Sequence, residues 1–373
     1  MNRGLYIHFP FCEKKCNYCD FYSVANHSQK NAYIDALVRE AEKLRDKRIK
    51  VDTVFFGGGT PSLFSPSELE RIMTALHSSF IIEKGAEITL EANPMTLKDG
   101  DKLSAFHSLG VNRLSVGVQS FSDTELQALG RGHTRDDAVN TILTANKVGF
   151  DNISLDLMLG IPYQTDESLK KSLDTALSLP LTHISVYALS IEENTVFGRK
   201  AKKGEDLHLP EDDREMYLNA CEMLEENGFE HYEISNFAKK GFRSRHNMKY
   251  WRAEEYIGLG ASAHSYFESE RYAFGDSIKA FIEKAEQVEA YKNTPEDRKE
   301  EFVMLSLRLS DGLDLERLEK EFGVKPDDSL FSLLYEFEKH RLLTFKDNTV
   351  ALTNEGFYVS NSVIVKILEE LKI

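Results

Sequence analysis

Three cysteines near the start of the chain are the residues whose type and spacing most clearly indicate chemistry. Cys12, Cys16 and Cys19 lie within eight residues, in the order Cys-x-x-x-Cys-x-x-Cys, directly after an apolar stretch. Thiolates are the protein ligands of [4Fe–4S] clusters, and three of them on a tight loop would leave the fourth iron open to another ligand. A zinc site that adds His8 is the alternative. Structural zinc prefers four closed ligands at paired spacings, so the spacing favours the cluster.

A glycine run and several polar residues follow the predicted strands further along. Residues 57–61 read Gly-Gly-Gly-Thr-Pro, and glycines let a backbone approach a ligand closely. Alone, such a run is typical of a sharp turn; beside the cysteines it favours binding. Glu91 ends a predicted strand, Gln119 ends the next, and Asp156 lies within the one after. Arg131 follows in Gly-Arg-Gly-His-Thr and is suited to meet a carboxylate. In barrels the chemistry is built at the C-terminal ends of the strands, so we expect these residues to share one face.

The pattern of the chain predicts a scaffold that brings strand ends together. Apolar segments with period-two alternation predict strands at 4–9, 52–56, 87–91, 112–119, 152–159 and 183–189. Amphipathic segments between them predict helices at 28–47, 65–80, 97–109, 135–148 and 166–178. Alternating strands and helices predict an α/β fold with a parallel sheet. No Gly-x-Gly-x-x-Gly follows the first strand, so a partial (β/α)6 barrel of the TIM type is favoured over a dinucleotide-binding sheet.

The rest of the chain has a different organisation. Residues 192–210 are predicted to form a long surface loop, followed by a helix at 211–227. Further helices are predicted at 278–291, 296–309, 314–322 and 327–341, followed by a hairpin around 346–348 and a last helix. Helices followed by a hairpin resemble a winged helix. The sequence therefore predicts a barrel domain over residues 1–270 and a small helical, winged-helix-like domain over residues 271–373.

Composition and charge exclude several classes of protein. Hydrophobic residues make up 41% and charged residues 29%, which is typical of a globular chain. The net charge of −15 disfavours nucleic-acid binding, and the last 103 residues, the winged-helix-like region, hold fifteen basic against twenty-one acidic residues. No apolar run is long enough for a membrane span. No secretory signal is visible, so a cytoplasmic location is expected, and Cys221 is expected to be an inert buried thiol.

The motifs together resemble a known family. The cysteine spacing is that of the radical S-adenosylmethionine (SAM) superfamily. The segments YIHFPFC, FFGGGTPS, LEANP, GVQSF, LGRGHT and DLMLGIP resemble, in order, the oxygen-independent coproporphyrinogen III oxidases and their close relatives, over nearly the whole chain. The resemblance implies a [4Fe–4S] cluster held by Cys12, Cys16 and Cys19. It also implies SAM contacts from Tyr6, Tyr18, Gly58, Gly59, Thr60, Glu91, Gln119, Arg131 and Asp156.

Two differences separate the chain from the oxidases. They carry a fourth cysteine two residues after the third, where this chain has Phe21, and a long N-terminal extension, where five residues precede Tyr6. The HemW-type heme chaperones show Cys-Asp-Phe at this place and a His-Asn-x-x-Tyr-Trp motif, which this chain has at residues 246–251. The resemblance therefore implies a protein that binds heme and passes it to an acceptor protein. The alternative is a coproporphyrinogen III dehydrogenase that oxidatively decarboxylates propionate side chains. If SAM is cleaved, an electron donor is a further partner.

The motif at residues 246–251 also has a physical interpretation. An imidazole is a ligand of heme iron, and aromatic side chains offer flat faces to a macrocycle. The heme contacts implied are His246, Asn247, Tyr250 and Trp251. A hydrogen-bonded loop histidine is the alternative, and a second axial ligand is left open between Met248 and His264.

Overall fold

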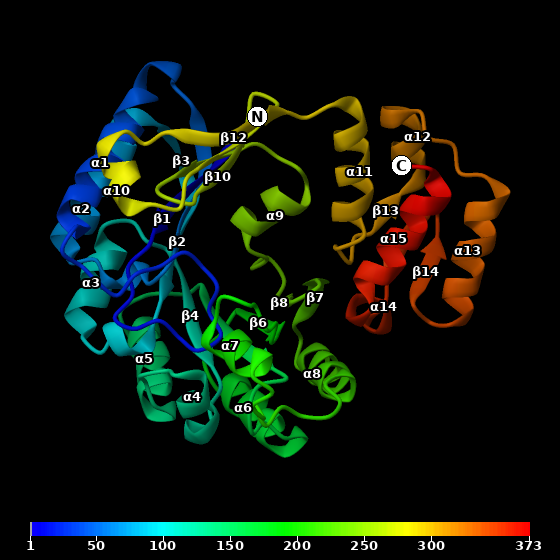
Figure 1. Ribbon diagram of the computed structural model, residues 1–373, viewed down its shortest axis with the longest axis horizontal. Coiled ribbons are helices and arrows are strands. Elements are labelled where there is room, and N and C mark those ends of the chain that lie inside the picture. Colours follow the sequence, from blue (N-terminus) through cyan, green and yellow to red (C-terminus); the bar gives the residue numbers. More distant parts are fainter. Residues whose placement is uncertain (1) are drawn as a thin grey trace. The chain divides into compact units, whose positions relative to one another are not determined.

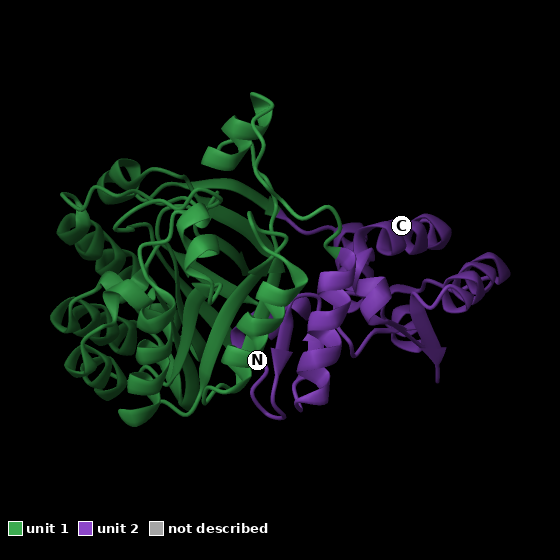
Figure 2. Cartoon of the chain, turned by 90° about the horizontal axis from the view of Figure 1, so that it is seen from below, with its two compact units in different colours: residues 1–213, 255–291 green, residues 214–254, 292–373 purple. Residues whose placement is uncertain are grey.

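The computed structural model describes residues 2–373 (Figure 1), which divide into two compact units (Figure 2). Unit 1 contains the chain up to Asp213 together with Glu255–Tyr291. Unit 2 contains Arg214–Glu254 and Lys292–Ile373. Each unit is thus built from two separate stretches of sequence. The domain boundary between residues 270 and 271 stays a prediction.

Unit 1 is built on a mixed sheet. Its strands are β1 (Arg3–Phe9), β2 (Lys50–Gly58), β3 (Ile81–Ala92), β4 (Arg113–Gln119), β5 (Ile153–Leu159), β6 (His183–Ala188), β9 (Tyr256–Leu259), β10 (His264–Phe267), β11 (Glu270–Phe274) and β12 (Gln287–Lys292). They lie in the order β12-β11-β10-β9-β1-β2-β3-β4-β5-β6. Strands β1 to β6 and β9 are parallel, and β10 and β11 are antiparallel. The predicted α/β class with a parallel sheet is confirmed.

The helices of unit 1 include those that connect the parallel strands, which lie along one side of them (Figure 1). They are α1 (Lys30–Lys43), α2 (Pro66–Ser79), α3 (Gly100–Ser108), α4 (Asp123–Leu129), α5 (Arg135–Lys147), α6 (Asp166–Leu177), α7 (Val196–Lys202) and α10 (Ile278–Glu283), with short 3₁₀ turns at Arg45–Lys47, Pro61–Leu63 and Pro94–Thr96. Helix α2 begins with a capping box in which Ser65 and Glu68 bond each other's backbone N–H groups. Such caps satisfy donors that a helix start leaves free. The starts predicted at 65, 135 and 166, which all carry capping boxes, lie within one residue of the observed ones.

The two faces of the parallel strands differ in polarity. In β4 the alternate residues Leu114, Val116 and Val118 are apolar and buried, whereas Arg113 and Ser115 point to the other face. The same alternation runs through the neighbouring strands. One face therefore carries Thr53, Glu87, Thr89, Glu91, Arg113, Ser115, Ser154, Asp156, His183 and Ser185. We call this set the polar face. The apolar residues pack under the connecting helices, so the polar face is the inner one.

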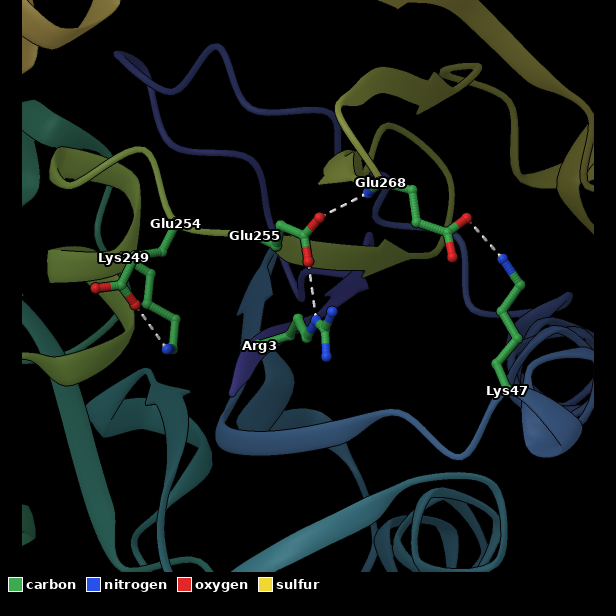
Figure 3. A network of polar contacts seen from close by, with 6 residues as sticks. All are labelled: Arg3, Lys47, Lys249, Glu254, Glu255 and Glu268. Carbon is green, nitrogen blue, oxygen red and sulfur yellow. Dashed lines mark hydrogen bonds and ion pairs between the residues drawn. The ribbon is translucent and has the colours of Figure 1, made fainter. Parts of the chain in front are cut away.

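Ionic contacts fasten the first strand to the strands added beside it. Arg3 at the start of β1 pairs with Glu255, with 2.9 Å between Nε and Oε2. Glu255 also accepts the backbone N–H of Glu268 at 2.8 Å, and Glu268 pairs with Lys47 at 3.1 Å (Figure 3). The two ion pairs join residues more than 200 positions apart in sequence. They fix the position of β9 beside β1, and with it the edge of the sheet.

Two expectations for individual elements are wrong. Residues 192–210 are not a loop throughout, because Thr195 accepts the backbone N–H of Gly198 and starts α7. The predicted helix at 278–291 ends at Glu283, and β12 follows. Ala285 and Glu289 have φ values of 49° and 56°, which a right-handed helix excludes. The short strands β9 to β11 were not predicted, because each has only four or five residues.

Unit 2 combines helices with short antiparallel strands. Its elements are α8 (Arg214–Glu226), β7 (Glu230–Glu233), β8 (Asn236–Ala238), α9 (Arg245–Trp251), α11 (Pro295–Ser306), β13 (Leu313–Asp314), α12 (Leu315–Phe322), α13 (Asp328–Lys339), β14 (Leu343–Lys346), β15 (Thr349–Leu352), α14 (Asn354–Tyr358) and α15 (Ser360–Leu371). Strands β13, β15 and β14 form an antiparallel sheet. The hairpin between β14 and β15 turns on Asp347 and Asn348, whose φ values of 50° and 60° suit a tight hairpin turn. The helices expected at 296–309, 314–322 and 327–341 and the hairpin around 346–348 are thus present. Across residues 2–373, none of the helices combines the length and apolar character that crossing a membrane requires.

Candidate functional site

The segment between β1 and α1, which we call the cysteine loop (residues 10–29), is anchored at both ends. The backbone N–H of Cys12 donates to the carbonyl of Val24 at 3.0 Å. The Nε2 of His27 donates to the carbonyl of Cys12 at 3.0 Å. In the middle, the backbone N–H of Asn17 donates to the carbonyl of Leu129, and its side-chain amide donates to the carbonyl of Ala128 at 2.9 Å. The loop is therefore tied to α4 as well as to its own ends.

The three cysteines of this loop are free, half-buried thiols, and their sulfur atoms meet donors. The hydroxyl of Thr60 donates to Cys12 Sγ at 3.4 Å, and a guanidinium N–H of Arg131 donates to Cys16 Sγ at 3.6 Å. Burial raises the pKa of Cys12, and it raises the pKa of Cys19 to about 11, with a further rise from the charge of neighbouring Cys16. Thiolates in this loop therefore need a compensating positive charge, which iron supplies.

The imidazole of His8 is engaged elsewhere, which bears on the zinc alternative. Its Nε2 donates to the carbonyl of Tyr22 at 3.1 Å, so Nδ1 accepts the hydroxyl of Tyr6 at 3.0 Å. Burial lowers the pKa of His8 to about 4, so the ring is neutral at neutral pH. Within residues 2–373, no group of three or more His, Cys, Asp and Glu side chains is arranged to hold a single metal ion. A [4Fe–4S] cluster spreads its ligands over three irons, and the donors at two sulfurs fit such a cluster.

The glycine run fits closely against β1 and the cysteine loop. The backbone N–H of Gly59 donates to the carbonyl of Phe9, and that of Thr60 donates to the carbonyl of Phe11, both at 2.8 Å. A Cβ on Gly59 would lie 2.7 Å from the Phe11 carbonyl oxygen, and one on Gly58 would lie 2.6 Å from the His8 ring. The Cβ positions are thus taken by protein atoms. The requirement for glycine follows from packing that holds the cysteine loop against β2.

Two carboxyl groups of the polar face lie on strands β3 and β5, and that of Glu91 contacts this run. Glu91 Oε2 accepts the backbone N–H of Gly58 at 3.2 Å, and Asp156 accepts the hydroxyl of Ser115 at 3.4 Å. Burial raises the pKa of Glu91 to about 8, and the charge of Asp156 adds to the rise. Burial also raises the pKa of Asp156, and a hydrogen bond from Ser185 opposes the rise. The charge of Asp156 therefore acts on Glu91, and both side chains lie on the polar face.

Arg131 connects the cysteine loop to β4. Its guanidinium donates to the carbonyl of Gly117 and to Cys16, and it hydrogen-bonds the hydroxyl of Tyr18. Its Nε is buried and finds no acceptor among the described residues. Gln119 follows at the end of β4 with a φ of 74°, a strained value for a residue with a side chain. An unused buried donor beside two acids fits a ligand such as SAM, which carries both a carboxylate and an ammonium group.

The SAM contacts implied by the resemblance belong to neighbouring strands and loops of unit 1. Tyr6 lies in β1, Gly58 in β2, Glu91 in β3, Gln119 in β4 and Asp156 in β5. The pairing of β1 to β5 as consecutive neighbours brings the ends of these strands to one edge. The remaining four residues are Tyr18, Gly59, Thr60 and Arg131, which the contacts above place against the cysteine loop and β4. Their role in holding SAM stays a prediction.

The His-Asn-x-x-Tyr-Trp motif lies in unit 2, in helix α9, which Ser244 caps. The side chain of His246 is fully buried, and its Nε2 hydrogen-bonds the hydroxyl of Tyr250 at 2.8 Å. Asn247 is half-buried on the same helix, and Lys249 pairs with Glu254 (Figure 3). The imidazole is therefore buried and held by its hydrogen bond to Tyr250. A heme ligand at this position would have to exchange the hydrogen bond to Tyr250 for a bond to iron.

Trp251 is the last residue of the same helix and packs against a small apolar cluster. This cluster comprises Tyr232, Ala238, Met248 and Leu309, with Phe242 and Trp251 packed on it. The guanidinium of Arg308 lies 6.0 Å from the Trp251 ring centre. Of the two candidates for a second ligand, Met248 is part of this cluster, whereas His264 is exposed in β10 of unit 1.

Sequence reasoning missed several residues of the polar face. Arg113, Ser115 and Ser185 were not singled out, although each takes part in the surroundings of the carboxyl pair. The sequence does carry a signal for them, because polar residues or glycine alternate with apolar residues along two strands. The polar or glycine positions are 113, 115 and 117 in β4, and 154 and 156 in β5. Alternation of this kind in parallel strands indicates a polar inner face.

Comparison with known proteins places the chain in a family. Residues 6–176 match the radical SAM superfamily, and residues 293–359 match the HemN C-terminal domain. A heme chaperone HemW of Bacillus subtilis (strain 168) is 39% identical over 380 aligned residues, which cover 99% of this chain and 100% of the relative. The chain belongs to the HemW family. A second HemW, of Lactococcus lactis, is 35% identical over 97% of this chain and 96% of its own.

The HemW family assignment agrees with the fold. The structure of coproporphyrinogen III oxidase (HemN) from Escherichia coli, titled as a radical SAM enzyme, superposes with a TM-score of 0.85 over 98% of this chain and 90% of its own. At 22% identity this likeness shows the fold alone. The radical SAM superfamily implies SAM and a [4Fe–4S] cluster as cofactors. The expected resemblance to HemW-type proteins is confirmed.

Proposed function

We propose that this protein binds heme and transfers it to an acceptor protein, and that its radical SAM barrel holds a [4Fe–4S] cluster and SAM. The observation that carries the proposal is the similarity to heme chaperones over the whole chain, 39% identity with all of the B. subtilis relative aligned. Phe21 adds support. Where the oxidases that the chain resembles have a fourth cysteine, this chain has an aromatic side chain that is 70% exposed.

In this proposal the residues of unit 1 bind and orient the cofactors. Cys12, Cys16 and Cys19 ligate the cluster, Thr60 and Arg131 donate to the sulfurs, and the unused Nε of Arg131 takes a carboxylate oxygen of SAM. Together, the cluster and SAM supply one-electron chemistry when bound. An electron donor is then a further partner. All four cysteines are free thiols, which supports a reducing compartment such as the cytoplasm.

Heme is assigned to the motif in helix α9. His246 supplies the axial nitrogen, Tyr250 and Trp251 offer flat faces, and Asn247 lies beside them on the helix. The buried position of His246 sets a condition on this role: the imidazole has to leave Tyr250 before it reaches iron. Release of heme then restores an internal hydrogen bond, which suits a protein that passes its ligand on.

Heme titration of the full chain tests the proposal. The protein is reconstituted anaerobically with iron and sulfide, and heme is added while the Soret band is recorded. We expect saturable binding and a spectrum that differs from free heme. An absence of saturable binding would contradict the chaperone assignment.

The same preparation tests the alternative function. We expect no conversion of coproporphyrinogen III in the presence of SAM and a reductant. Phe21 stands where the oxidases that the chain resembles have their fourth cysteine, so this chain lacks one residue of the oxidase motif. Stoichiometric formation of protoporphyrinogen in this assay would favour the oxidase instead.

A further inference from the structure

The indole of Trp251 carries a buried N–H group that has no hydrogen-bond acceptor among residues 2–373. Trp251 is the last residue of α9, the helix of the His-Asn-x-x-Tyr-Trp motif, and its ring packs on the apolar cluster of unit 2. A buried indole N–H usually finds an acceptor, because an unpaired buried donor is costly. An unpaired donor in this motif therefore favours an acceptor that a bound ligand supplies.

Arg308 places a positive charge beside the same ring. It follows α11, is half-buried, and its guanidinium lies 6.0 Å from the ring centre of Trp251. One guanidinium N–H donates to Oδ1 of Asn361 at 3.0 Å. In the described part of the chain, Arg308 forms no ion pair with a carboxylate. The rest of its planar set of N–H donors is therefore available to a ligand.

A second arginine at the same apolar cluster shows the usual arrangement. The guanidinium of Arg243 lies 5.6 Å from the ring centre of Tyr232, much as Arg308 lies beside its own aromatic ring. The charge of Arg243, however, is paired within the fold, with Glu230 at 3.6 Å and with Asp311 at 3.0 Å. The fold thus supplies carboxylates for one of these two arginines and leaves the other to be paired by a ligand.

A buried acid near Arg308 does not serve as its partner. Glu233 of β7 is 1% exposed and accepts the side-chain amide of Asn236. The charge of Arg308 acts on Glu233, but no contact joins the two groups. Burial raises the pKa of Glu233 to about 7, so its carboxyl group is only partly ionised at neutral pH. Glu233 therefore does not replace a carboxylate in contact with the guanidinium.

A carboxylate is the ligand group that these donors fit. Its two oxygens accept parallel hydrogen bonds from the planar fork of an arginine, and such charge-assisted bonds are the strong ones. Heme, the ligand proposed for α9, carries two propionate carboxylates on one edge of the macrocycle. Its iron and its propionates need different partners. His246 supplies a nitrogen for the iron, and the donors beside Trp251 suit a propionate.

We propose that Arg308, together with the indole N–H of Trp251, binds a propionate carboxylate of heme and thereby orients the macrocycle on α9. This inference rests on the proposed assignment of heme to the motif in α9. It adds to that assignment a residue from outside the motif. It also predicts a specificity that an iron ligand does not give, because Arg308 distinguishes free propionates from esterified ones.

The experiment compares heme with heme dimethyl ester, which keeps the iron and the macrocycle but has no free carboxylate. Both are titrated into the full chain while the Soret band is recorded. We expect the parent to bind heme about tenfold more tightly than the ester, as the loss of a charge-assisted hydrogen bond implies. Arg308→Met should lose this preference: heme binds about tenfold more weakly and the ester is little affected. The Soret position should not change, because the iron ligand remains.

Three further variants control the experiment. Arg243→Met also removes an arginine beside an aromatic ring of the cluster, but one whose charge is already paired, so the preference for heme over the ester should be retained. Arg308→Lys keeps the charge without the planar fork and should recover part of the preference. Trp251→Phe keeps a flat face and removes the N–H group, so it should weaken the binding of heme more than that of the ester.

The ratio of the two affinities decides the inference separately from the proposed function. Equal binding of heme and ester by the parent, or an equal loss for both in Arg308→Met, overturns the inference while the heme assignment stands. A parent that binds neither compound contradicts the proposed function and this inference together. Circular dichroism shows whether each variant is folded. If Arg308→Met does not fold, Arg308→Lys and Trp251→Phe decide by the same ratio, and an unchanged ratio in both overturns the inference.

Discussion

Cys12, Cys16 and Cys19 differ from Cys221 in their surroundings, and the difference allows a controlled test. The first three are half-buried on a loop, with donors at two of the sulfurs. Cys221 is fully buried in α8, where burial raises its pKa to about 12. A thiol in such a position is neither reactive nor available to iron. This difference was predicted from the sequence, because three cysteines within eight residues are typical of cluster ligands, whereas an isolated cysteine is typical of a core residue.

We predict that replacing Cys12, Cys16 and Cys19 together by Ala abolishes the brown chromophore of the reconstituted protein while the fold survives. Iron and sulfide content, together with circular dichroism, measures this. Cys221→Ala is the matched control and should keep about four irons per chain. Full iron content in the triple variant would refute the ligand assignment.

For His246 the sequence predicts a heme contact, and the structure adds a buried hydrogen bond to Tyr250. We predict that His246→Ala weakens heme binding about ten- to a hundredfold, as the loss of a ligand or of a buried polar partner does. The substitution also removes the hydrogen bond between His246 and the Tyr250 hydroxyl, which should lower the free energy of unfolding by about 1–3 kcal/mol. Heme titration and urea unfolding measure the two effects.

Tyr250→Phe is the control for this experiment. It removes the same hydrogen bond but keeps the imidazole, so heme binding should be retained. Trp251→Ala should weaken binding with little spectral shift, because the indole packs without ligating. If His246→Ala binds heme with an unchanged spectrum and affinity, the ligand lies elsewhere, and Met248 and His264 are the next residues to test.

Strands and helices of unit 1 were predictable where one physical signal dominated. The parallel strands are runs of apolar residues at alternate positions, and helix starts such as Ser65 carry side-chain caps. Prediction failed where the signal was short or mixed. Strand β12 has exposed residues throughout and reads as a continuation of the helix before it. Strand β9 contains a glycine whose Cβ would lie 2.2 Å from a backbone oxygen, a requirement of close packing that propensity does not reveal.

The glycine run illustrates how an element can be recognised for an incomplete reason. Sequence reasoning expected glycine because a ligand approaches the backbone. The structure shows that β1 and the cysteine loop already fill the Cβ positions of Gly58 and Gly59. Close approach of a ligand and close packing against β1 both require glycine in this segment. The sequence motif was therefore recognisable, although its packing role was not. The candidate site was predictable from strand ends, whereas its supporting contacts depend on tertiary structure.

We predict that Gly58→Ala lowers the free energy of unfolding by at least about 2 kcal/mol and reduces the iron content of the reconstituted protein. Gly58 has a φ of 106°, and an added Cβ would meet the His8 ring at 2.6 Å. A left-handed backbone alone costs about 1–2 kcal/mol for a residue with a Cβ, and the clash adds to that. Urea unfolding and iron analysis measure the outcome.

Gly85→Ala provides the matched control within the same sheet. Gly85 lies in β3 with a φ of 81°, and nothing lies within 4 Å of the added Cβ. This variant should show only the backbone cost, roughly 1 kcal/mol, with iron content unchanged. Equal effects of the two substitutions would show that packing against His8 contributes nothing.

At the scale of the whole molecule, charge constrains what the chain binds. A net charge of −15 repels phosphate backbones. Helix α13, which occupies the place of a recognition helix, exposes Phe331 and Tyr335 and carries Asp328, Glu336 and Glu338 against Lys339. A helix that binds DNA is basic. The surface of this helix therefore does not suit a phosphate backbone, and the absence of nucleic-acid binding stays a prediction.

Buried neutral histidines predict how the metal-free molecule responds to acid. Burial lowers the pKa of His133 to about 4, whereas the ring takes up a proton near pH 6.5 when unfolded. The folded state thus binds fewer protons between these values, so the stability that His133 contributes is present above pH 6.5 and is lost as the pH falls toward 4. At 1.36 kcal/mol per pKa unit, this amounts to roughly 3 kcal/mol. His8 has the same depressed pKa of about 4 and acts in the same direction.

We therefore predict that the free energy of unfolding of the metal-free protein falls as the pH is lowered from 6.5 to 4.5, and that His133→Gln flattens part of this fall. The His133 Nε2 donates to the carbonyl of Val118 at 3.1 Å, and a glutamine amide retains a donor without the proton uptake. His77→Gln, at an exposed position on α2, is the matched control for the substitution itself. Urea unfolding at pH 7, 6, 5 and 4.5 measures all three proteins. If His133→Gln and the parent lose stability in parallel, buried His133 is not a source of the acid sensitivity.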